Sequence, residues 1–103
     1  MSRDITVETE IRDVSIIKDV LTQLGHTFQE RAGMVTVDGR RYQISINTDT
    51  GNVNYDEDIK STVDKICQEY TTAVFKDRAI REGNQVTQEV NAQGEIVLHI
   101  SRV

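Results

Sequence analysis

The chain has 103 residues, of which 37% are hydrophobic and 28% charged, and its formal net charge is −5. A chain of this length buries roughly 60–70% of its unfolded surface, so residues 1–103 are expected to form a single domain. The acidic balance disfavours a protein whose affinity comes from neutralising phosphates. A single cysteine excludes an intramolecular disulfide and favours a reducing, cytoplasmic location. No apolar run is long enough to span a membrane, and the N-terminus lacks the apolar core of a signal peptide.

The first predicted elements are a strand and a helix. Apolar residues alternate with polar ones from Ile5 to Ile11, which is typical of a half-buried strand. Asp13 is the expected N-cap of a helix over 14–24, because apolar residues then recur at helical spacing and Gly25 follows them. Residues 26–30 fit either a short strand or an extended arm.

A hairpin is predicted between Met34 and Asn47. Asp38-Gly39 is typical of a two-residue type I′ turn, which needs a positive φ at both residues and would set Val37 opposite Arg40. In this register one face carries Val35, Val37, Tyr42, Ile44 and Ile46, and the other carries Thr36, Arg41, Gln43, Ser45 and Asn47.

The remaining elements are a short strand, a long helix and a second hairpin. Residues 53–55 form the strand, and the apolar stripe that follows predicts a helix over 58–82, capped by Asp56 or Asp58 and ended by Gly83. The final hairpin pairs residues 86–90 with 96–100.

A three-residue loop with Gly94 in the left-handed conformation sets the register of that final hairpin. It pairs Val90 with Ile96 and Val86 with Ile100, and it turns Gln88 inward beside Leu98. A buried glutamine needs hydrogen-bond partners, so this register implies a frayed strand end or a bulge.

The element order is therefore β-α-(β)-β-β-β-α-β-β, with no repeat, linker or low-complexity segment. Helices and sheets bury their apolar faces against one another in layers. The sequence predicts an α+β fold, a two-layer sandwich of a mostly antiparallel sheet with two helices on one face.

Several segments resemble a known family in order and spacing. They include Ser2-Arg3, Ile11-Arg12-Asp13 and Leu24-Gly25 in the first half, and Gln68-Glu69-Tyr70, Gly94-Glu95-Ile96 and Ser101-Arg102-Val103 in the second. These are similar to the uncharacterised plastid and cyanobacterial Ycf-thirty-five-like family, a bacterial and phage domain of unknown function. Phe28 and Val103 stand where the family pattern has tryptophan. The resemblance implies a shared fold and a bacterial or phage source, but no activity and no functional residue.

The sequence shows no catalytic, cofactor or metal constellation, so we expect a non-enzymatic protein. Cys67 falls on the apolar stripe of helix 58–82 and is predicted to be a buried structural residue. His26 and His99 lack the companion ligands of a metal site. The acidic cluster at 56–58 lacks the ligand spacing of a calcium loop.

Partner binding is the leading functional hypothesis. The polar sheet face opposite the helices would carry Arg41, Gln43 and His99, whose hydrogen-bonding groups suit recognition of another protein. The apolar stripe of helix 58–82 could alternatively serve a homodimer. Nucleic-acid binding, or mimicry of nucleic acid by an acidic phage-type protein, is the second hypothesis, with a basic patch at Arg31, Arg40 and Arg41.

Overall fold

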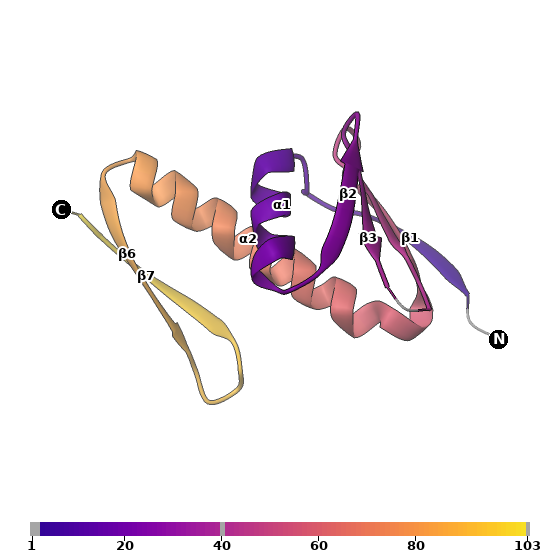
Figure 1. Cartoon of the computed structure of the whole chain (residues 1–103). Coiled ribbons are helices and arrows are strands. Elements are labelled where there is room, and N and C mark those ends of the chain that lie inside the picture. Colours follow the sequence, from indigo (N-terminus) through magenta and orange to yellow (C-terminus); the bar gives the residue numbers. More distant parts are fainter. Residues whose placement is uncertain (1–2, 40, 103) are drawn as a thin grey trace. The chain divides into compact units, whose positions relative to one another are not determined.

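The computed structural model describes residues 3–39 and 41–102. Its elements are, in chain order, β1 (Asp4–Glu8), α1 (Val14–Gln23), β2 (Thr27–Arg31), β3 (Met34–Asp38), β4 (Ile44–Asn47), β5 (Asn52–Asp56), the 3-10 turn η1 (Glu57–Ile59), α2 (Lys60–Arg81), β6 (Asn84–Val90) and β7 (Ile96–Arg102). The strand pairs between described residues are antiparallel, and the fold is α+β (Figure 1). The predicted fold class and element order are confirmed, and the ambiguous segment at 26–30 forms β2.

The chain divides into two compact units, a first unit up to Tyr70 and a second unit from Thr71 onward. The first unit contains a five-stranded sheet in the order β1-β5-β4-β3-β2, together with α1 and the first part of α2. The second unit contains the rest of α2 and a separate two-stranded sheet of β6 and β7. The prediction of one sheet carrying both helices on one face is wrong in the number of sheets. That residues 1–103 form a single domain stays a prediction.

Helix α1 begins and ends as its sequence predicts. The Asp13 carboxylate accepts a hydrogen bond from the backbone N–H of Ile16 at 3.0 Å. At the other end Gly25 has a φ of 81°, and the N–H of His26 donates to the carbonyl of Leu21 at 2.9 Å. This left-handed cap fixes where the chain leaves the helix and therefore where His26 lies.

The core of the first unit draws apolar side chains from α1, from the first part of α2 and from the strands of the five-stranded sheet. The buried apolar side chains are Ile11, Ile17, Val20, Leu21, Val35, Val37, Ile44, Ile46, Val53, Tyr55, Val63, Ile66 and Tyr70. The Tyr70 hydroxyl accepts hydrogen bonds from the backbone N–H groups of Arg12 and Asp13, at 3.2 and 3.1 Å. Tyr70 therefore ties α2 to the segment that starts α1.

The β3–β4 hairpin has a wider loop than predicted. Val37 pairs with Ile44 and Thr36 with Ser45, so the loop covers 39–43. Arg40, the predicted partner of Val37, lies outside the described residues. The actual partner comes four residues later, an even shift, so the apolar and polar faces of the two strands stay as predicted.

Gly39 does not have the left-handed φ that a type I′ turn requires. An added Cβ at this position would collide with the carbonyl oxygen of Tyr42. The glycine is needed because the loop backbone folds back closely on itself, and the predicted type I′ turn is wrong.

The β6–β7 hairpin has the predicted register and loop. Val90 pairs with Ile96 and Val86 with Ile100, and Gly94 has a φ of 81°. Every residue from Asn84 to Val90 has a partner, so no bulge is present. Gln88 does lie on the apolar face, but it is exposed, so the conflict predicted for a buried glutamine does not arise.

Candidate functional site

A hollow of about 320 Å³ in the first unit lies between the β3–β4 loop and the start of α2. Its lining residues are His26, Val37, Asp38, Gly39, Arg41, Tyr42, Ile44, Ile59 and Thr62. Val37, Ile44 and Ile59 contribute aliphatic side chains to this lining, and His26, Asp38 and Arg41 contribute ionisable ones. The volume is at the small end of the range for ligand pockets.

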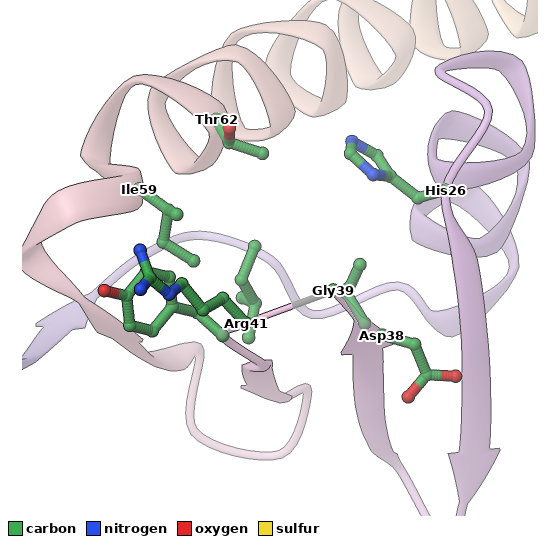
Figure 2. Close-up of a pocket in the computed structure, with 9 residues that line it drawn as sticks. His26, Asp38, Gly39, Arg41, Ile59 and Thr62 are labelled. Carbon is green, nitrogen blue, oxygen red and sulfur yellow. The ribbon is translucent and has the colours of Figure 1, made fainter.

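The ionisable side chains around this hollow do not converge on one point. In Figure 2 His26 extends toward α2, Arg41 lies on the opposite side, and the Asp38 carboxylate points away from the hollow. Among the described residues these three side chains make no hydrogen bond or ion pair with one another. These three side chains therefore do not form a hydrogen-bonded nucleophile and base of the kind that covalent catalysis uses.

The Tyr42 hydroxyl donates to the Asp58 carboxylate at 3.0 Å, which links the β3–β4 loop to η1. The backbone N–H of Asp58 donates a hydrogen bond to the Asp56 carboxylate at 2.9 Å, and this bond holds Asp58 in place. Asp56 therefore caps η1, the turn that leads into α2. These carboxylates have structural partners, and no group of three or more potential metal ligands is found within 3–39 and 41–102.

The three residues predicted to form a partner-binding face lie in different places. Arg41 and Gln43 are exposed in the β3–β4 loop, outside any strand. His99 is on β7 in the second unit, where its Nε2 lies 2.9 Å from the Glu89 carboxylate. The premise that all three stand on one sheet does not hold, and their role in partner binding stays a prediction.

The open face of the five-stranded sheet is polar, and acidic residues outnumber basic ones on it: Asp4, Glu8, Asp38 and Asp56 against Arg31. One row crosses all five strands through Thr6, Asn54, Ser45, Thr36 and Gln29. The Asn54 amide donates to the Thr6 hydroxyl at 2.9 Å within this row. Sheets that read RNA present stacking aromatic side chains on such a face, and this row has none.

The second unit exposes large apolar side chains on both its helix and its hairpin. Phe75 and Ile80 of α2 are 49% and 64% exposed, and Val90 and Ile100 of the hairpin are 64% and 51% exposed. Among the described residues of this unit, Ala79 is the buried apolar one. Sequence reasoning missed this surface because it assigned the apolar faces of β6 and β7 to the common core.

Cys67 is half-buried in α2 and not fully buried as predicted. Burial raises the pKa of its thiol, and the nearby negative charge of Asp64 adds to the effect. A raised pKa lowers the thiolate population at neutral pH, which is opposite to the activation of a catalytic cysteine.

No family model, curated protein or solved structure matches this chain. The resemblance to the Ycf-thirty-five-like family therefore stays a prediction. None of the helices in the described part of the chain combines the length and apolarity of a membrane span.

Proposed function

We propose that this chain is a non-enzymatic accessory module that binds another protein, and that the second unit supplies the contact surface. The observation that carries the proposal is the exposure of Phe75, Ile80, Val90 and Ile100. Exposed large apolar side chains gathered in one small unit are typical of interaction sites, because leaving apolar surface in water costs roughly 25 cal/mol per Å².

The first unit differs from the second in how far its large apolar side chains are exposed. Its large apolar side chains are buried or partly buried, and among the described residues of this unit Met34, at 40%, is the exposed one. Its hollow offers no convergent reacting groups. A cytoplasmic location is part of the proposal, because a lone cysteine suits a reducing compartment. A bacterial or phage source rests on the sequence resemblance alone.

Nucleic-acid binding has weaker support than protein binding. The net charge is −5, and the open sheet face carries Glu8 and Asp4 beside its neutral row. Arg31 and Arg41 lie in different segments, and Arg40 is outside the described residues. Salt dependence separates the two hypotheses, because a phosphate binder loses affinity steeply as salt is added.

The test is affinity capture with two surface variants and one matched control. Phe75→Gln with Ile80→Gln removes the helix surface while keeping good helix formers, and Val90→Thr with Ile100→Thr removes the hairpin surface while keeping β-branched residues. Met34→Gln is the control, because it removes the exposed large apolar side chain of the first unit, which is 40% exposed. We expect a captured protein that the control retains and that at least one double variant loses. Equal capture by all the variants would contradict the proposal.

A further inference from the structure

We infer that the partner of the second unit is a second copy of this chain, joined along the outer edge of β7 into a four-stranded antiparallel sheet. This inference rests on the proposed function, and it identifies the protein that the second unit binds. A two-stranded sheet is only marginally stable in water, and it normally needs a third strand or a helix packed against its apolar face. The apolar face of this hairpin is not fully covered, because Val90 and Ile100 are 64% and 51% exposed. The hairpin of β6 and β7 has seven-residue strands with no third strand beside them.

The outer edge of β7 presents backbone groups that lack a partner within the hairpin ladder. The Asn91 N–H donates to the Glu95 carbonyl at 3.0 Å, which makes these two residues a hydrogen-bonded pair. Hydrogen-bonded and non-hydrogen-bonded pairs alternate along an antiparallel ladder. The N–H and C=O groups of Ile96, Leu98 and Ile100 therefore point away from β6, on the same strand positions that carry the apolar side chains.

This edge is complementary to itself under a twofold axis. With Leu98 opposite Leu98 of the second copy, Ile96 comes opposite Ile100, and all six apolar positions of the two strands face apolar positions. The same alignment uses every outward N–H and C=O of these three residues. A shift by two residues would put Ile96 opposite Arg102 and His99 opposite His99, which loses apolar pairs and brings two titratable groups together.

The charges also fit this alignment. Arg102 of each copy comes opposite Gly94 of the other, and Glu95 comes opposite Ser101, so neither charge meets a charge of the same sign. His99 comes opposite Val97 and keeps its own Glu89 partner at 2.9 Å. No like charges stand opposite each other in the resulting sheet.

The other strand edges are less suited to this contact. Edge strand β1 carries Asp4 and Glu8, and edge strand β2 carries Arg31 and turns Glu30 toward the apolar face, which are the features that prevent edge pairing. The outer edge of β6 has Gln88 at its centre. The β7 edge combines outward backbone groups with an uninterrupted apolar row, which favours it over these alternatives.

Proline at an outward position tests the edge without removing a hydrogen bond of the hairpin. Leu98→Pro removes the outward N–H of β7, and Gln88→Pro makes the same change at the directly paired position of β6. In sedimentation velocity over a range of concentrations we expect the parent and Gln88→Pro to dimerise. Leu98→Pro should associate about tenfold more weakly or not at all, since each lost bond weakens pairing.

Disulfide trapping tests the register even if the proline variant does not fold. Directly opposed hydrogen-bonded residues have Cα atoms about 5.5 Å apart, within the range a disulfide spans. In a Cys67→Ala background, Leu98→Cys should oxidise to a covalent dimer, and Gln88→Cys should stay monomeric under the same conditions.

A parent chain that is monomeric at every concentration, or equal trapping at both positions, would overturn the inference. If the chain is monomeric and the capture experiment still identifies a protein lost with the hairpin variant, only the identity of the partner is wrong.

Discussion

The two units bury their apolar side chains to very different extents. Of the buried apolar residues in the described chain, thirteen belong to the unit up to Tyr70 and one, Ala79, to the unit from Thr71 onward. Four of the five exposed large apolar side chains belong to the second unit. Both units contain well-formed antiparallel hairpins, so regular secondary structure alone does not produce a core.

This contrast shows that two properties of a strand are separate. One is the alternation of apolar and polar residues along it, and the other is whether another element covers its apolar face. In the first unit the apolar face of the central strands is covered, and Ile46 is fully buried there. The apolar row of β6 and β7 has the same alternation, but Ile100 remains half exposed. Exposed Gln88 in the middle of that row agrees with a face that is not fully dehydrated in a single chain.

The largest expected effect is the loss of unfolding free energy when a buried isoleucine is truncated, compared with the loss at an exposed isoleucine. Ile46→Ala should lower the free energy of unfolding by about 2–5 kcal/mol, because it leaves a cavity in a packed site. Ile100→Ala should cost below about 1 kcal/mol in dilute solution, where its side chain is half solvated. Denaturant unfolding at low protein concentration measures both, and similar losses would show that the second unit has a core of its own.

The next effect compares two glycines of equal backbone conformation. Gly51 and Gly94 have φ values of 80° and 81°, but an added Cβ at Gly51 would collide with the Thr9 carbonyl oxygen, and at Gly94 it meets nothing within 4 Å. Gly94→Ala should cost about 1 kcal/mol from backbone strain alone. Gly51→Ala should cost about 2 kcal/mol or more beyond that. Equal thermal shifts in the two variants would refute the tight packing assigned to the β1–β5 contact.

The smallest expected effect concerns Cys67, in the last turns of α2 that belong to the first unit. Its pKa is raised above the ordinary 9.0 in the folded state, so the neutral thiol is favoured there. The resulting stability is fully present below the unfolded pKa and is lost as the pH rises through the folded pKa. The free energy of unfolding should therefore decrease as the pH rises above about 9 in the parent relative to Cys67→Ala, by less than about 1 kcal/mol. A gap between the two proteins that stays constant over this range would contradict the shift.

The sequence was sufficient for the fold class, the element order and most caps, because these depend on local chemistry. Asp13, Gly25 and Gly94 each act at the position that their own conformational preferences indicate. The β3–β4 loop could not be predicted, because Asp38-Gly39 favours a tight turn locally but the long-range contact of Tyr42 with Asp58 accompanies a wider loop.

The candidate site was harder to predict than the fold. Arg41, Gln43 and His99 share a face only if all strands join one sheet, and no local pattern states that β6 and β7 pair with each other alone. The exposed apolar surface was visible in the sequence as alternation at 86–100. Its exposure was not, because burial depends on which elements meet in three dimensions.

Site-resolved amide hydrogen exchange at two protein concentrations tests the central contrast most directly. The amides of Ile44 and Ile46, on a strand with neighbours on both sides, should be protected at both concentrations. The outward amides of Ile96, Leu98 and Ile100 should exchange quickly in dilute protein and become protected as the concentration rises. Strong protection of these three amides in dilute monomer would show that the second unit is already complete, and no protection at any concentration would show that the β7 edge is not the contact.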